Sequence, residues 1–219
     1  RHCYLLESAE NDQKWGRYSF LGYAPTMELT CMDGQMTLRR GTEEEEQTAE
    51  TFTTDHPGDT IRKILSEYKS PKIKGLPPFT GGLVGYFSYD YLKYAEPTLR
   101  FPEEGNSDFR DVDLMLFDKV IAFDHYRQKL CLITGVSTAE LEDSYKKAEK
   151  ELDEMEALLK SGAKAVIRPL KMKSPLAFRY SKETYCQMVE KAKHYIHECD
   201  IFQVVLSDPM SAPAEGSLF

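Results

Sequence analysis

The stretch that decides the fold lies at residues 27–38 and reads Met27-Glu28-Leu29-Thr30-Cys31-Met32-Asp33-Gly34-Gln35-Met36-Thr37-Leu38. Two runs of strand-forming residues flank an Asp-Gly pair. That pair favours a type I′ turn, which needs a positive φ at both of its central positions. The stretch therefore predicts an antiparallel hairpin, with strands at residues 27–31 and 36–38.

Working outward, we predict further strands where aromatic, aliphatic and β-branched residues gather, at residues 4–6, 18–23 and 81–87. The glycines of the 81–87 strand permit close backbone approach. A second hairpin is expected over residues 114–133, with its turn near residues 124–128. The polar stretch 41–58, which contains the run Glu43-Glu44-Glu45-Glu46, is expected to be a surface loop.

Three helices are expected from apolar periodicity and capping residues. Asp59 fits the N-cap of the first, and Ser137 with Glu140 forms a capping-box pattern for the second, which Gly162 should end. The third should begin after Ser181 and run to about residue 198. The apolar stripe of the second helix fits packing on a sheet, although its spacing also suits a coiled coil. That stripe comprises Leu141, Tyr145, Ala148, Leu152, Met155 and Leu159.

Strands outnumber helices and pair through hairpins, so the predicted fold class is α+β, with antiparallel sheets and helices packed across them. The basic connector at residues 163–175 contains Pro169 and Pro175. We expect a domain boundary there, with an N-terminal domain at residues 1–170 and the start of a second domain at residues 171–219.

The composition argues against several classes of protein. A formal charge of −8 argues against a nucleic-acid partner. No apolar run approaches the length of a membrane span. The five scattered cysteines form no CxxC pair, which is typical of a reducing compartment and predicts a cytoplasmic protein. Because the chain opens with Arg1 in strand-like sequence, a preceding targeting segment stays possible.

The residues by themselves predict no complete active site. The sequence has neither of the two phosphate-binding glycine motifs and no GxSxG, and its five histidines are dispersed. The most informative polar residue is Gln203, within residues 200–207, which read as a helix running into a buried strand. A buried amide needs partners for its donor and acceptor groups, so Gln203 could line a polar pocket or could be a satisfied core residue.

Four ordered blocks of this sequence resemble component I of the anthranilate synthases, a family of chorismate-utilising enzymes. The blocks are Leu5-Leu6-Glu7-Ser8, Gly16-Arg17-Tyr18-Ser19-Phe20-Leu21-Gly22, the segment from Pro78 to Asp90 that contains Gly81-Gly82-Leu83-Val84-Gly85-Tyr86, and Asp200-Ile201-Phe202-Gln203-Val204-Val205-Leu206-Ser207. The resemblance spans nearly the whole chain and implies that the chain stops where the catalytic domain of that family begins.

In this family the first block forms part of a feedback site for L-tryptophan. The resemblance therefore implies that Glu7 offers a carboxylate to the ammonium group, that Ser8 offers a hydroxyl, and that Leu6 packs against the indole. Arg17 lies at about the position where relatives have a basic residue near the ligand. Without the resemblance, Glu7 and Ser8 could simply begin a turn.

The resemblance assigns Gln203 to the chorismate pocket. Relatives that add water to chorismate have a Lys there as general base, whereas an amide cannot take up a proton, so Gln203 fits an enzyme that uses ammonia. A Gln203 exposed to solvent and outside any strand would count against this assignment. Two departures from the family pattern stand nearby: Cys199 replaces a glycine, and Asp208-Pro209-Met210 replaces a Gln-Arg-Phe run.

By resemblance, the intact enzyme is a lyase that converts chorismate and ammonia to anthranilate and pyruvate in tryptophan biosynthesis. A glutamine amidotransferase subunit supplies the ammonia, and Mg²⁺ holds the substrate carboxylates. The family's catalytic residues and metal ligands would lie beyond Phe219, so we expect this chain to be inactive alone. Two alternatives stay open: aminodeoxychorismate synthase component I, disfavoured by the run Trp15-Gly16-Arg17-Tyr18-Ser19 after the first block, and a stand-alone tryptophan-binding or subunit-docking module.

Overall fold

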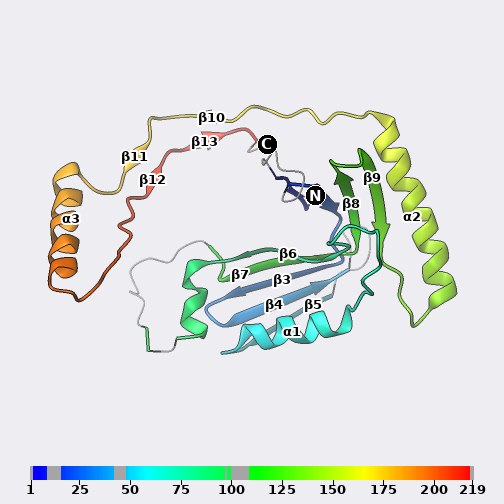
Figure 1. The fold of residues 1–219 in the computed structure, drawn as a ribbon, viewed down its shortest axis with the longest axis horizontal. Coiled ribbons are helices and arrows are strands. Elements are labelled where there is room, and N and C mark those ends of the chain that lie inside the picture. The colour runs from blue at the N-terminus through cyan, green and yellow to red at the C-terminus, as the bar shows by residue number, and fades with distance from the viewer. Residues whose placement is uncertain (1, 9–15, 42–47, 97, 100–108, 218–219) are drawn as a thin grey trace. The chain divides into compact units, whose positions relative to one another are not determined.

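The quoted hairpin forms the centre of a five-stranded antiparallel sheet. The computed structural model describes residues 2–8, 16–41, 48–96, 98–99 and 109–217, and the chain divides into two compact units, residues 1–162 and 163–219. In the first unit the larger sheet has the order β5-β4-β3-β7-β6 (Figure 1). Its strands are β3 (Met27–Met32), β4 (Gln35–Arg40), β5 (Thr48–Thr53), β6 (Gly82–Phe87) and β7 (Val112–Phe117).

The turn of this hairpin has the predicted geometry. Asp33 and Gly34 have φ values of 49° and 77°, so both central positions are left-handed, as a type I′ turn requires. The two strands pair from Met27 with Arg40 to Met32 with Gln35. The predicted hairpin is confirmed.

Alternating side chains of this sheet form the core together with helix α1 (Pro57–Glu67), which lies along the sheet in Figure 1. Ile61 and Ile64 of α1 pack among the apolar residues of β3, β4 and β7. The cluster comprises Met27, Leu29, Cys31, Met36, Leu38, Ile61, Ile64, Val112, Leu114 and Leu116.

The expectation of a loop throughout residues 41–58 was wrong. β5 forms inside that stretch and pairs with β4, and Phe52 packs against the core. The β-branched threonines of β5 suit a strand, and without β5 the ladder of β4 would be open on that side. Residues 42–47, including the acidic run, lie outside the described residues.

A second antiparallel sheet, of four strands, has the order β1-β2-β8-β9. Its strands are β1 (Cys3–Leu6), β2 (Tyr18–Tyr23), β8 (Lys119–Asp124) and β9 (Lys129–Thr134). The predicted turn between β8 and β9 is confirmed. The predicted hairpin over residues 114–133 is corrected in one respect: residues 112–117 belong to β7 of the other sheet, and Asp118 alone links the two strands.

Helix α2 (Leu141–Ser161) packs beside β9, as the sheet-packing alternative predicted. Ala148 and Met155 are buried, while Leu141 and Tyr145 are more than half exposed. The Thr134 hydroxyl donates to Glu151 Oε2 at 2.7 Å. Only the middle of the predicted apolar stripe is therefore deeply buried.

Two of the predicted helix starts were wrong. α1 begins at Pro57, because a proline suits the first helical turn, and Asp59 pairs with Arg62 within the helix. α2 begins at Leu141, and the Ser137 hydroxyl accepts from the Ala139 amide instead of forming a capping box. The left-handed Gly162 ends α2 as predicted.

The second unit contains helix α3 (Lys182–His197) and four two-residue strands. The predicted N-cap of α3 is confirmed, because the Ser181 hydroxyl accepts from the Thr184 amide at 3.2 Å. β10 pairs with β13, and β11 pairs with β12. These strands are β10 (Lys171–Met172), β11 (Ala177–Phe178), β12 (Met210–Ser211) and β13 (Ala214–Glu215).

Antiparallel sheets and helices confirm the predicted α+β class. Residues 173–176 connect β10 to β11. A short 3₁₀ helix, η1 (Tyr89–Tyr94), follows β6. No helix in the described ranges is both long and apolar enough to cross a membrane.

Candidate functional site

Two of the sequence blocks meet at one end of the four-stranded sheet. β1 and β2 are antiparallel, with Leu6 opposite Phe20, so Glu7 and Ser8 follow β1 at the end where Arg17 precedes β2. Tyr18 pairs in turn with Asp124, the last residue of β8. This arrangement, which we call the sheet end, brings the Leu6-Glu7-Ser8 run and Arg17 to the same edge.

A cluster of aromatic rings lines one face of this sheet and brings in the third block through Phe79. Tyr4 contacts Phe117 edge-on, with ring centroids 4.7 Å apart. Phe20 contacts Phe79 at 5.6 Å and stacks with Tyr18 at 5.8 Å. Leu6 shares this face because it lies two residues from Tyr4 along the strand. An apolar aromatic wall of this kind is suited to packing against the ring of a small amphipathic ligand.

The predicted ligand residues differ in exposure. Leu6 is 48% exposed and Glu7 is exposed, so both could reach a ligand, while Ser8 is partly buried. Trp15 lies outside the described residues.

Arg17 is bound to an acidic residue that the sequence analysis did not single out. Its Nε donates to Asp124 Oδ1 at 3.0 Å, and its Nη2 donates to Oδ2 at 2.6 Å. The guanidinium also lies over the rings of Tyr18 and Tyr126, at 4.9 and 5.5 Å. This bidentate pair joins the beginning of β2 to the end of β8.

Asp124 is buried and fully satisfied. Besides Arg17, its Oδ1 accepts from the backbone amides of Tyr126 and Arg127, at 3.1 and 3.0 Å. The hydrogen bonds from Arg17, followed by those backbone amides, hold the pKa of this carboxyl well below its usual range. The sequence carried one signal for this role, since an Asp at the start of a turn often accepts from the following amides.

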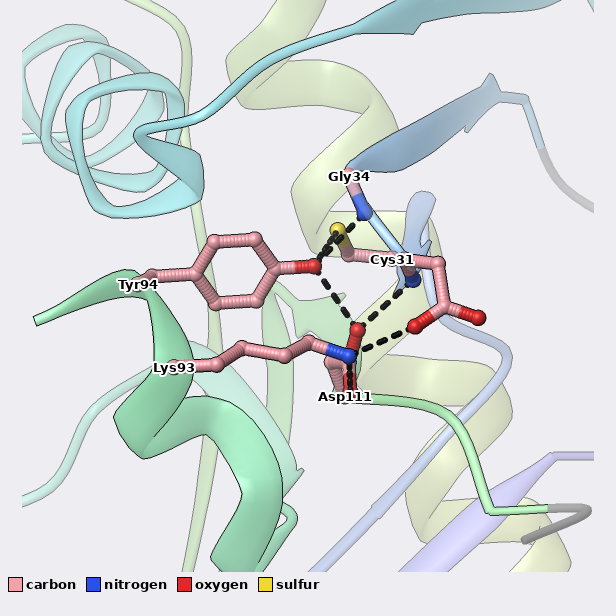
Figure 2. A network of polar contacts seen from close by, with 6 residues as sticks. Cys31, Gly34, Lys93, Tyr94 and Asp111 are labelled. Carbon is pink, nitrogen blue, oxygen red and sulfur yellow. Dashed lines mark hydrogen bonds and ion pairs between the residues drawn. The ribbon is translucent and has the colours of Figure 1, made fainter. Parts of the chain in front are cut away.

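A second polar cluster lies at the turn of the β3–β4 hairpin, and Figure 2 shows its members converging on Asp111. Asp111 Oδ2 accepts from the Tyr94 hydroxyl at 2.7 Å and from the Asp33 amide at 2.8 Å. Lys93 Nζ lies 2.9 Å from Asp111 Oδ1 and 2.7 Å from Asp33 Oδ1. Sequence reasoning missed this cluster, because its residues come from three separate segments.

The Tyr94 hydroxyl both donates and accepts hydrogen bonds within this cluster. Its hydroxyl accepts from the Gly34 amide at 2.6 Å and lies 3.5 Å from Cys31 Sγ. Burial, with hydrogen bonds to Cys31 and Asp111, raises the pKa of Tyr94 far above its ordinary value, and burial raises the pKa of the Cys31 thiol. Because its groups satisfy one another, the cluster anchors η1 and β7 to the hairpin turn and offers no reactive group.

Gln203 lies in the second unit and does not have the predicted surroundings. Residues 201–209 form no strand, and Gln203 is exposed, so the prediction of a buried strand was wrong. Within the described part of this unit no strand pairs with the segment, and Phe202 and Val205 are 92% and 79% exposed. A strand is buried only where neighbouring strands and an apolar layer cover it, and the described residues of this unit supply neither.

Cys199, which replaces a glycine of the family pattern, lies at the C-terminal end of α3. Cys199 has a φ of 66°, in the left-handed region that glycine adopts without strain. The Cys199 amide donates to the Ile196 carbonyl and the Asp200 amide to the Tyr195 carbonyl, which is the Schellman pattern at a helix end. The Asp208 carboxylate accepts from the Tyr180 amide at 3.2 Å, so this departure serves to anchor the segment before α3.

The described residues do not fit a metal ion. In the ranges that the structure covers, no three His, Cys, Asp or Glu side chains come together as a metal site would require.

Comparison with known proteins identifies the family. The family model described as chorismate binding enzyme matches residues 1–219. The chain is 35% identical over 219 residues to anthranilate synthase component 1 of Acinetobacter calcoaceticus, covering 98% of this chain and 43% of that protein. It is 31% identical to aminodeoxychorismate synthase component 1 of Bacillus subtilis, over 94% of this chain and 42% of that protein.

A solved structure agrees with these matches. The crystal structure of anthranilate synthase component I from Streptococcus pneumoniae TIGR4 superposes with a TM-score of 0.70 and 25% identity, over 97% of this chain and 45% of that one. The chain therefore spans less than half the length of these relatives. The exposed Gln203 does not overturn the assignment, because the match extends over every block: this chain belongs to the chorismate binding enzyme family.

Proposed function

We propose that this chain is part of an anthranilate synthase component I, a cytoplasmic lyase of tryptophan biosynthesis. The full-length protein would convert chorismate and ammonia to anthranilate and pyruvate, with ammonia from a glutamine amidotransferase subunit. The observation that carries the proposal is the 35% identity to an anthranilate synthase component 1 along 98% of this chain. Five free cysteines support a reducing compartment.

We further propose that the sheet end takes part in feedback inhibition by L-tryptophan. The aromatic wall beside Leu6 suits an indole ring, and the Glu7 carboxylate would attract the ammonium group. A pocket formed by this edge alone would be shallow, because Leu6 and Glu7 are exposed. The remainder of the longer protein would supply its other wall.

Gln203 would line the chorismate pocket once further strands cover its segment. Its amide cannot act as a general base, which supports ammonia over water as the nucleophile. Mg²⁺ would bind the substrate carboxylates through ligands in the remainder of the protein.

A direct test compares the 219-residue chain with the full-length protein, each supplied with chorismate, ammonium salt and Mg²⁺. We expect anthranilate fluorescence from the full-length protein and none from the 219-residue chain. Anthranilate from the shorter chain would contradict the proposal that it is inactive alone. A full-length protein that makes no anthranilate would contradict the proposed function itself.

The first alternative is aminodeoxychorismate synthase component 1, supported by the 31% identity to the Bacillus subtilis protein. Product analysis separates the two, because that enzyme would release aminodeoxychorismate and retain the enolpyruvyl group. The second alternative, a stand-alone tryptophan-binding or subunit-docking module, predicts measurable heat when L-tryptophan is titrated into the folded 219-residue chain. We expect no such heat, since half a pocket binds weakly.

A further inference from the structure

We infer that Asp124 and Arg17 act together as positioning residues for the regulatory ligand, and that Arg17 is not itself a ligand contact. This inference rests on the proposed tryptophan response. It differs from what the family resemblance implies for Arg17, namely a basic residue near the ligand.

The guanidinium of Arg17 is already paired with the Asp124 carboxylate. Two of its nitrogens donate to the two oxygens of one buried carboxylate, at 3.0 and 2.6 Å. Two aromatic rings lie against the guanidinium. A guanidinium that is neutralised and stacked in this way has little capacity left for the carboxylate of a ligand.

The second argument is the order of the strands. β1 lies at the edge of the four-stranded sheet, and β2 is its neighbour there. The position of Glu7 and Ser8 therefore depends on β2, and the start of β2 is fixed to β8 by the Arg17–Asp124 pair. The backbone supports the same link, because the His125 amide donates to the Arg17 carbonyl at 2.8 Å.

The third argument is that Asp124 also fixes the turn that follows β8. Its Oδ1 accepts from two turn amides in addition to Arg17. One carboxylate thus joins the start of β2, the end of β8 and the turn between β8 and β9. Loss of this carboxylate should shift the sheet end as a unit and weaken a ligand held by Glu7 and Ser8.

The test measures the tryptophan concentration that halves anthranilate formation by the full-length protein with its amidotransferase subunit. The variants are Asp124→Asn, Arg17→Met and the double variant. If the pair positions the sheet end, each single variant should raise that concentration by a similar factor, roughly 2- to 30-fold. The double variant should be no worse than either single variant, because both remove the same link.

A direct contact between Arg17 and the ligand predicts a different pattern. Asp124→Asn would then release the guanidinium and leave tryptophan inhibition unchanged or stronger, while Arg17→Met would weaken it. That result overturns the inference.

The matched control is Lys119→Met, at the opposite end of β8. Lys119 forms a part-buried ion pair with Glu151 at 3.6 Å, so its loss perturbs the same strand away from the sheet end. We expect its tryptophan response and its KM for chorismate to be unchanged. If Lys119→Met weakens tryptophan inhibition by the same factor, the effect of the Asp124 and Arg17 variants is general destabilisation. That result overturns the inference.

If Asp124→Asn protein fails to fold, Arg17→Lys provides the comparison, since Lys keeps the charge but loses the two-pronged geometry. An unchanged tryptophan response in a folded Arg17→Lys protein overturns the inference. Wild-type protein that makes anthranilate but ignores tryptophan overturns the inference without contradicting the proposed reaction. Wild-type protein that makes no anthranilate contradicts the proposed function first.

Discussion

Tyr4 lies across Gly22, its partner in the β1–β2 ladder, so closely that a Cβ atom on Gly22 would come within 2.2 Å of the Tyr4 ring. The ring covers the glycine and contacts Phe117 edge-on. This relationship ties a residue beside the first sequence block to a residue within the second. The absence of a side chain at position 22 is therefore needed for the aromatic wall.

Gly22→Ala should destabilise the protein by about 1–3 kcal/mol, because the added methyl displaces the Tyr4 ring from its packed position. Chemical denaturation of the purified protein measures the loss. Gly135→Ala is the matched control, since a Cβ there would lie 3.4 Å from that of Asp118, an ordinary contact. Equal effects in the two variants would contradict the steric explanation.

Tyr4→Phe should leave stability unchanged or slightly raised. The Tyr4 hydroxyl is buried and has no hydrogen-bond partner among the described residues, and burial raises the pKa of Tyr4 to about 12. Removal of an unsatisfied hydroxyl relieves a desolvation cost. A clear loss of stability on denaturation would instead reveal a partner for this hydroxyl.

Tyr94→Phe should cost about 1–3 kcal/mol, because the Gly34 amide loses its acceptor and Asp111 loses a donor. Thermal unfolding gives the change. The control is Tyr89→Phe in the same 3₁₀ helix, since Tyr89 is 86% exposed and its hydroxyl should contribute little. If both variants unfold at the wild-type temperature, the cluster does not anchor the hairpin turn.

Cys199→Gly should stabilise the protein by about 1 kcal/mol, since glycine adopts the left-handed conformation of this position without strain. The measurement is again the unfolding midpoint. Glu198→Gly serves as the control: Glu198 has a φ of −73°, so glycine there gains nothing. A midpoint that falls with Cys199→Gly would refute the account of this departure from the family pattern.

Asp118→Asn should stabilise the protein at neutral pH, and the gain should shrink as the pH falls. Burial raises the pKa of Asp118, with Glu151 adding to the rise, and Lys119 and Lys147 opposing it. A folded-state pKa above the unfolded value means that the folded protein binds the proton more readily, so ionisation costs stability above that pKa. Denaturation at several pH values tests this. The exposed Asp153, changed to Asn, provides the matched control for the loss of one carboxylate.

The sequence predicted those features that local chemistry controls. The Asp33-Gly34 turn, the Ser181 cap and the Gly162 helix end each depend on a few adjacent residues, and each formed as expected. Helix starts were less reliable, because Pro57 competed with Asp59 for the first turn of α1. Strand β5 was missed because its pairing with β4 is visible only once the sheet exists.

In the candidate site, too, residues within local sequence blocks were predicted and a partner distant in the sequence was not. Leu6, Glu7, Ser8 and Arg17 were named from blocks of sequence, and the structure brings them to one sheet end. Asp124 lies 107 residues from Arg17 and was not found, since no local pattern pairs residues at that separation. Gln203 was expected in a buried strand from its apolar neighbours, yet those neighbours require a covering layer that the described residues of the second unit do not provide.

The one-residue link at Asp118 has a consequence for folding. β7 and β8 belong to different sheets, and the link holds no slack to absorb a slipped register. A shift of β7 by one position against β3 would turn Val112, Leu114 and Leu116 toward the opposite face and drag β8 along with it. Mispairing in either sheet would thus disrupt the strand pairing of both. We therefore expect the two sheets to fold in a single cooperative step.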